Sequence, residues 1–254
     1  MSMIGQLLLD GDWDSAFALA DELPLGPQTA VPGHVHGCLW LARAAYARSD
    51  TQQASSWLAR ISPDADTSSD IQLRNLALWR RAIVAVGERR PADALPLLGE
   101  VAQGLIALNY IGFAQPILED AATAANDLRD AKLALPVAAL FDTVPRAQRT
   151  RAVELGRARI RANAAASREE HDTAAEEYAL ALATARNLGK APLLGPILVD
   201  YGRWLVHTSR VDEAAPLLEE ARTLFKRMKA TDWLDRTGEA ALTKREPEIT
   251  ARPS

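Results

Sequence analysis

Two stretches of the sequence decide the fold prediction: "EHDTAAEEYALALA", which begins at Glu170, and "SRVDEAAPLLEEA", which begins at Ser209. Each stretch opens with polar residues and then reaches an alanine, Ala174 or Ala214, with a large apolar residue four positions later. Residues four apart lie on the same face of a helix. A small residue there lets two helices approach closely, and the large residue fills the seam with the next pair. Both stretches are therefore predicted to be the second helix of a packed pair.

The same pattern recurs earlier in the chain, as "GDWDSAFALADEL" from Gly11, "DTQQASSWLARI" from Asp50 and "RPADALPLLGEV" from Arg90. The anchoring alanines are Ala16, Ala54, Ala94, Ala174 and Ala214. Their successive gaps are 38, 40, 80 and 40 residues, and the long gap leaves room for a degenerate copy near 131–134. A period near 40 that is built from two helices is typical of an α-solenoid, in which several stacked pairs bury what one pair leaves exposed.

Strand signals are scarce, and helix-forming Ala, Leu, Arg and Glu dominate between regularly spaced breaks. The predicted helices cover 12–23, 30–48, 51–61, 69–87, 91–104, 113–128, 130–142, 146–167, 170–188, 193–208, 211–228 and 232–244. The predicted fold is an all-α solenoid of about six antiparallel helix pairs over residues 1–245. The polar tail 246–254 is expected to be disordered.

Composition narrows the class of protein. The 254 residues are 48% apolar and 24% charged, which excludes wholesale disorder. A net charge of −4 argues against direct binding to nucleic acid, and the single cysteine, Cys38, excludes a disulfide framework. The chain opens without a secretory signal, and the uncharged stretch 101–118 carries too many polar and helix-breaking residues for a membrane span. We therefore expect a cytoplasmic protein with no membrane contact.

Two of the copies resemble the second helix of tetratricopeptide-type repeats, which carries an alanine, a large apolar residue four positions on and another alanine seven positions on. The matches are Ala174–Tyr178–Ala181 and Ala214–Leu218–Ala221, and Gly202 lies twelve residues before Ala214, where the family has a glycine in its first helix. The period is longer than the usual 34 residues of that family. The resemblance implies a right-handed superhelix whose first helices line a concave groove.

Residues 147–242 also resemble a more specific group of proteins. The resemblance is carried by the run "RVDEAAPLLEEARTLF" from Arg210 and by the later Asp232-Trp233-Leu234. They are similar to the C-terminal repeats of large ATP-dependent bacterial regulators of the LuxR and maltose-activator types, and of related cyclase–ATPase proteins. In such proteins the repeats sense an effector or a partner. The chain has no phosphate-binding loop and no helix-turn-helix after the last repeat. We therefore expect either a domain cut from a larger regulator or a free-standing repeat protein, and the first pair, which looks incomplete, favours the fragment.

No residue pattern predicts catalysis, a metal or a cofactor. His34 and Cys38 are spaced to share a helix face, but His36 points elsewhere and no fourth ligand lies nearby. The favoured interpretation is a core cysteine with two histidines at the rim. Tandem glutamates such as Glu176-Glu177 point about 100° apart on a helix and form no carboxylate pair. The chain is therefore predicted not to be an enzyme.

Seven arginines and a single acid occur between Arg146 and Arg168. In one continuous helix, four of them would lie within an arc of roughly 60°. This basic stripe is Arg146, Arg157, Arg161 and Arg168. It could receive an acidic peptide, a phosphate or another subunit; the favoured interpretation is a solvated face or partners for the glutamates of the next helix.

The groove positions of tetratricopeptide repeats, transferred to the pairs that fit best, select six residues as a candidate binding set. These are Arg43, Tyr46, Arg159, Asn163, Arg203 and His207. In the third pair the same positions are apolar, at Trp79, Ile83 and Val86. Either the repeat is shifted there relative to the other pairs, or the groove is apolar at that point. Tryptophans are expected in the core, with Trp233 on a final helix that caps the stack.

The function predicted from these features is a non-enzymatic regulatory module that binds a protein segment, with acidic segments favoured by the arginines, in a concave groove. The alternative is a sensor arm that holds a small-molecule effector on its inner surface. Association of several copies is a further option that the sequence leaves open.

Overall fold

The computed structural model describes residues 3–22 and 31–242, and within these ranges the chain forms α-helices and short 3₁₀ turns with no strand. The N-terminal helices are α1 Met3–Asp10, α2 Trp13–Glu22, α3 Pro32–Ala47, α4 Thr51–Ala59, α5 Ile71–Gly87 and α6 Pro91–Ala107. The C-terminal helices are α7 Gln115–Asp127, α8 Leu135–Leu140, α9 Arg151–Ser167, α10 His171–Leu188, α11 Ala191–His207, α12 Val211–Met228 and α13 Thr231–Leu242. The all-α prediction is confirmed.

Consecutive helices pack as antiparallel pairs: α1 with α2, α3 with α4, α5 with α6, α9 with α10, and α11 with α12. All five anchoring alanines, which are Ala16, Ala54, Ala94, Ala174 and Ala214, are completely buried. A Cβ added at Gly202 would lie 2.6 Å from the side chain of Leu218, so only glycine fits where α11 crosses α12. Small residues therefore set the close approach within each pair, as the sequence predicted.

The turns between paired helices repeat with a constant period. A residue in the left-handed conformation ends the first helix of a pair every 40 residues, at Ser49, Arg89, Arg129, Glu169 and Ser209. Each donates its N–H to the carbonyl three residues back, and the next residue donates to the carbonyl five residues before itself. This is the Schellman motif, which satisfies the last carbonyls of a helix. The shared period is consistent with the repeat that the alanines predicted, and the turn at Arg129 continues it beside the expected degenerate copy near 131–134.

Three details of the predicted helices differ from the structure. The predicted helix 130–142 consists of two 3₁₀ turns around the short α8. Pro136 has no N–H to donate to the carbonyl four residues back, and Val144 is extended before Pro145. The predicted helix 146–167 begins five residues later, where Thr150 caps α9 by accepting a hydrogen bond from the N–H of Val153 at 3.2 Å. Helix α1 was missing from the prediction, although an incomplete first pair was expected.

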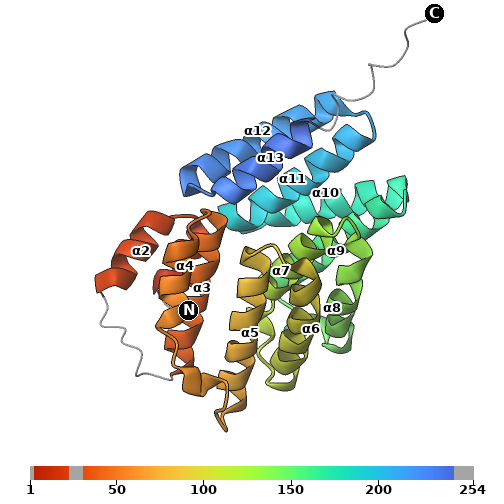
Figure 1. Cartoon of the computed structure of the whole chain (residues 1–254). Coiled ribbons are helices and arrows are strands. Elements are labelled where there is room, and N and C mark those ends of the chain that lie inside the picture. The colour runs from red at the N-terminus through yellow and green to blue at the C-terminus, as the bar shows by residue number, and fades with distance from the viewer. Residues whose placement is uncertain (1–2, 23–30, 243–254) are drawn as a thin grey trace, which may run out of the picture.

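The two ends of the helical array meet. Figure 1 shows the C-terminal helices (blue) lying across the ends of the N-terminal ones, and α1 packs against α11 while α13 packs against α3. Arg48 donates from Nε to the carbonyl of Met228 at 3.0 Å, and Lys229 pairs with Asp14 at 2.8 Å. In an open solenoid each repeat contacts only its neighbours. Here the first pairs contact the last pair, and the inner faces of the helices are turned toward one another.

Helix α13 is the final helix that Trp233 predicted, and the Trp233 ring stacks on Phe225 with centroids 5.5 Å apart. The predicted tail 246–254 lies outside the described residues. Among the helices that the structure describes, none combines the length and apolarity that crossing a membrane requires.

Ala174→Leu is predicted to destabilise the chain by about 1–3 kcal/mol, because three extra carbons cannot fit in a fully buried helix contact. Ala183→Leu, on the exposed face of the same helix, is the matched control and should change the free energy of unfolding by less than about 0.5 kcal/mol. Urea denaturation of both variants provides the measurement. Equal stability of the two variants would contradict the anchoring role.

Candidate functional site

The inner faces of several helix pairs surround one cavity of about 140 Å³. Its walls come from α1, α3, α5, α7, α11, α12 and α13, so it touches both the first and the last pairs of the array. The polar side is formed by Arg43 of α3 with Glu119 and Asp120 of α7, and Trp40 and Trp233 contribute aromatic surface. The cavity exists because the ends of the array meet, and we take it as the candidate functional site.

A buried ion triad lies behind the polar wall. Arg159 of α9, which is 1% exposed, donates from Nη1 to Oε2 of Glu119 at 2.6 Å and from Nε to Oδ2 of Asp200 at 2.7 Å. Asp200 also accepts from Asn163 at 2.9 Å, and the amide oxygen of Asn163 accepts from the hydroxyl of Tyr178 at 2.7 Å. The guanidinium of Arg159 joins α7, α9 and α11, and Asn163 extends these contacts to Tyr178 of α10.

Glu119 is incompletely paired within this triad. Its side chain is 7% exposed and lines the cavity, and its Oε1 is buried without a hydrogen-bond partner among the described residues. Burial raises the pKa of Glu119, and the positive charge of Arg159 opposes that effect. Arg159 stays charged, because the neighbouring carboxylates outweigh the effect of burial and raise its pKa. Nη2 of Arg159 is likewise buried without a partner, so among the described residues the triad leaves one acceptor and one donor unpaired.

Two further ion clusters complete the polar surroundings. Arg43 forms a bidentate pair with Asp120, with Nη2 and Nε at 2.6 and 3.0 Å from its oxygens. Arg236 of α13 pairs with Asp127 of α7 and with Asp232, whose other oxygen accepts at 2.6 Å from Arg89 in the turn after α5. The second cluster holds α13 against α7 and this turn, so charged groups hold the last helix beside the cavity.

A second, mostly apolar pocket of about 100 Å³ lies nearby between α3, α5, α6 and α7. His36 lines it and packs edge-on against Phe113, with ring centroids 4.7 Å apart. The Nε2 atom of His36 accepts a hydrogen bond from the indole N–H of Trp40 at 3.0 Å. Because Trp40 lines the central cavity, this bond connects the walls of the two cavities. Burial lowers the pKa of His36 to about 4, so the ring is neutral at pH 7.

The six residues of the predicted groove occupy three different surroundings. Arg43 and Tyr46 line the central cavity, and the Tyr46 ring fills the space where a Cβ of Gly87 would otherwise lie. Arg159 and Asn163 belong to the ion triad and its hydrogen-bond chain. Neither Arg203, which is half-buried, nor His207, which is exposed, contributes to the cavity wall. The structure brings the first four toward one centre and leaves the last two apart.

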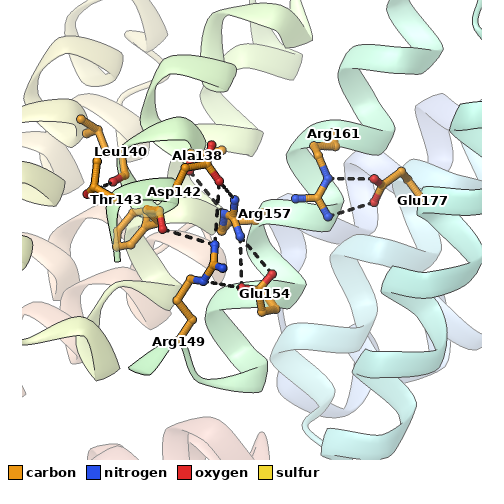
Figure 2. Close-up of polar contacts among 10 residues, drawn as sticks. Ala138, Leu140, Asp142, Thr143, Arg149, Glu154, Arg157, Arg161 and Glu177 are labelled. Atoms are coloured by element: carbon orange, nitrogen blue, oxygen red, sulfur yellow. Dashed lines mark hydrogen bonds and ion pairs between the residues drawn. The ribbon is translucent and has the colours of Figure 1, made fainter. Parts of the chain in front are cut away.

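The four arginines of the basic stripe do not lie on one continuous helix, because the chain is extended at Arg149, before α9 begins. Arg146 lies in a separate 3₁₀ turn before α9. Figure 2 shows Arg157 inside a cluster with Asp142 and Glu154, and Arg161 paired with Glu177 of α10 at 2.8 Å. Arg168 pairs with Glu170 at 2.8 Å. These three arginines all have carboxylate partners. Glu177 lies on α10, the next helix, and Glu170 is the residue just before that helix.

Cys38 and its neighbouring histidines show no arrangement for chemistry. Cys38 is buried, and burial raises the pKa of its thiol to about 11, which disfavours the nucleophilic thiolate. His34 lies 3.8 Å from the sulfur through Nε2, which is also 3.3 Å from the carbonyl of Arg60. Within residues 3–22 and 31–242, no group of three or more His, Cys, Asp or Glu side chains is placed to hold a metal ion.

The sequence analysis missed Glu119, Asp120 and Asp200, which carry the negative charge of the site. A signal was present: Glu119 and Asp120 lie in the otherwise uncharged segment "PILEDAATAA" from Pro116, and Asp200 lies in "GPILVDYG" from Gly195. A charged residue on the buried face of a helix is stable only when it is paired with an opposite charge or a hydrogen-bonding group inside the protein.

Arg159→Met is predicted to cost about 3–5 kcal/mol, because two buried carboxylates would lose their shared cation. The control is Arg186→Met, which removes an exposed pair with Glu220 and should cost no more than about 1 kcal/mol. Chemical denaturation at pH 7 compares the two. A loss below about 1 kcal/mol at Arg159 would show that the triad is not a structural requirement.

His36 predicts a pH dependence with a defined sign. Its folded pKa of about 4 lies below the ordinary value of 6.5, so the unfolded chain takes up a proton first as the pH falls. Stability from His36 is complete above pH 6.5 and is lost toward pH 4, by up to about 3 kcal/mol. His36→Gln should flatten this part of the stability profile, whereas His171→Gln at an exposed position should not. The measurement is the free energy of unfolding of the wild type and both variants from denaturation curves between pH 7 and pH 4.5. The same pH dependence in all three proteins would refute the role of His36.

Comparisons with known proteins assign no family to this chain. No family model matches it, and no curated protein and no solved structure matches it. What the structure establishes is an all-helical protein of sequentially paired helices, with the central cavity between its first and last pairs.

Proposed function

We propose that this chain is a non-enzymatic regulatory module that holds a small-molecule effector in its central cavity. In this proposal the pairs form a tetratricopeptide-like, right-handed solenoid whose ends have closed on each other. The observation that carries the proposal is the composition of the cavity wall, which includes α1 and α3 together with α11, α12 and α13. A molecule bound there would contact both ends of the array at once.

Such a ligand would bind beside the contact between the first and last helix pairs, which includes several polar interactions. Beside the ion pairs at Asp14 and Asp232, Lys190 pairs with Asp10 and Thr231 donates to the carbonyl of Arg48 at 2.5 Å. Contacts of this kind resemble the surfaces between mobile domains more than a hydrophobic core. A ligand that binds the closed form better shifts the population toward it, which is the basis of sensing. This supports a sensor arm of a cytoplasmic bacterial regulator, in line with the resemblance of residues 147–242.

Binding of a protein segment, the other function that the sequence indicates, needs a longer surface. A cavity of about 140 Å³ is smaller than the roughly 300–1,000 Å³ of typical drug-sized sites. An apolar cavity of roughly 150 Å³ holds a benzene ring in another protein, which sets the size of ligand expected here. A segment could lie along the inner helices only after α11–α13 had moved away from α1 and α3.

The test is a thermal-shift screen of small metabolites, about benzene-sized, against the wild-type chain and two variants. A ligand present at 100 times its Kd should stabilise the wild-type protein by about 2.7 kcal/mol. Ala47→Phe places a large ring at the cavity wall and should abolish the shift, whereas Ala183→Phe on an exposed face should preserve it.

Two outcomes would count against the proposal. One is a screen in which no compound stabilises the wild-type chain while a protein partner from lysate binds it stoichiometrically. The other is stabilisation that survives Ala47→Phe unchanged, because the ligand would then bind outside the cavity.

A further inference from the structure

Helix α7 presents a row of polar side chains to the central cavity, and one of them has no partner in the described part of the chain. Gln115, Glu119 and Thr123 lie on successive turns of α7, and all three line the cavity. The hydroxyl of Thr123 donates to the carbonyl of Glu119 at 2.9 Å, and the Glu119 carboxylate accepts from Arg159 at 2.6 Å. The side-chain amide of Gln115 makes no hydrogen bond to a described residue.

Gln115 is nevertheless a buried residue, with only 6% of its surface exposed. Unlike Oε1 of Glu119, neither the oxygen nor the nitrogen of its amide is completely enclosed by protein, so both atoms remain accessible. Buried side-chain amides are normally hydrogen-bonded, and the partner of this one must come from whatever fills the cavity. Water can supply both bonds, and a ligand that displaces this water loses affinity unless it replaces them.

The charged groups of the wall favour a ligand without net charge. Equal numbers of arginines and acids line the cavity, and each of these acids has an arginine partner. They are Arg43, Arg89 and Arg236, with Glu119, Asp120 and Asp232. A charged ligand would bring a charge that the wall leaves uncompensated, and burying such a charge is costly.

The apolar part of the wall limits the frame of the ligand. Ile83, Leu193, Phe225 and Trp40 all line the cavity. Its volume of about 140 Å³ is close to the roughly 150 Å³ of a cavity that holds benzene in another protein. The ligand therefore combines a compact apolar frame with a head group that meets both atoms of the Gln115 amide.

We infer that the effector of the central cavity is a small neutral amide, whose carbonyl accepts from Nε2 of Gln115 and whose N–H donates to Oε1 of Gln115. This inference rests on the proposed function and specifies its ligand class. A ketone can pair only with the nitrogen of Gln115, because it has no donor. A hydroxyl carries donor and acceptor on a single atom, so it meets the two amide atoms less directly.

The test uses probes that share a frame and differ in the head group. Isobutyramide is compared with 3-methyl-2-butanone, isobutyrate and isobutyramidinium, and δ-valerolactam is compared with cyclohexanone. Their Kd values for the wild-type chain are measured by NMR titration at pH 7. We expect each amide to bind at least tenfold more tightly than its ketone, because a site that hydrogen-bonds a ligand group rejects the analogue that lacks it. Isobutyramide should also bind at least tenfold more tightly than either ion.

Variants of Gln115 assign this preference to its amide. Gln115→Leu should reduce the preference for amide over ketone to about twofold or less, whereas Gln103→Leu at an exposed position should preserve it. Gln115→Glu keeps the shape of the side chain and places an acid in the first turn of α7, where the helix dipole favours it. This variant should prefer isobutyramidinium to isobutyramide, because two N–H groups of the cation match a carboxylate. Ala47→Phe should abolish binding of all the probes, and Ala183→Phe should leave it unchanged.

A measurement on the wild-type chain keeps the test decisive if the Gln115 variants do not fold. With ¹⁵N-labelled glutamine, the side-chain N–H signals of Gln115 should move downfield when isobutyramide is bound. Equal binding of amides and ketones would overturn the inference while leaving the cavity function intact. So would tighter binding of either ion, an amide preference that survives Gln115→Leu, or amide binding that leaves the Gln115 signals unchanged. A cavity that binds neither these probes nor any screened compound would remove the proposed function itself.

Discussion

The guanidinium of Arg159 is the group on which the centre of the structure depends. It is almost completely buried on α9 and is hydrogen-bonded to Glu119 of α7 and Asp200 of α11. These helices are the first members of three successive pairs, so one cation sets their spacing. A buried carboxylate without this cation would be costly, and the geometry therefore tolerates little change. The same arrangement leaves Oε1 of Glu119 and Nη2 of Arg159 buried without partners among the described residues.

Contacts within helix pairs and contacts between the first and last pairs both stabilise the fold, and they differ in kind. Within pairs, buried alanines and glycines allow close apolar packing, as at Ala174 and Gly202. Between the first and last pairs, ion pairs and side-chain hydrogen bonds to backbone carbonyls, as at Asp14 and Arg48, add to apolar contacts such as that of Met228 beside Gly11. Apolar burial provides most of the stability of a fold, whereas exposed ion pairs contribute little each. The paired helices and the junction that closes the cavity therefore share one apolar core, to which the polar contacts of the junction are added.

The local features of this chain were predictable because they depend on neighbours in sequence. The anchoring alanines identified the paired helices, and the left-handed turns repeat at the same 40-residue period. Prediction failed where an extended residue interrupted a helical pattern, at Val144 and at Arg149. The basic stripe depended on a continuous helix through that break, so its geometry was lost with it. Arg43 and Arg159 were predicted as binding residues from their register, whereas their partners Asp120 and Glu119 were not.

By itself, the sequence determined that the chain is all-helical, that its helices pack in sequential pairs, and which small residues lie between them. These properties follow from helical periodicity and from the size of side chains, which act over a few residues. Only the tertiary structure decided that α13 reaches α3 and that α1 reaches α11, because residues such as Arg48 and Met228 are far apart along the chain. That closure turns the inner faces into one cavity, whose wall includes Arg43, Glu119 and Asp120. Pairing of charges across such distances depends on the path of the whole backbone, which no local pattern specifies.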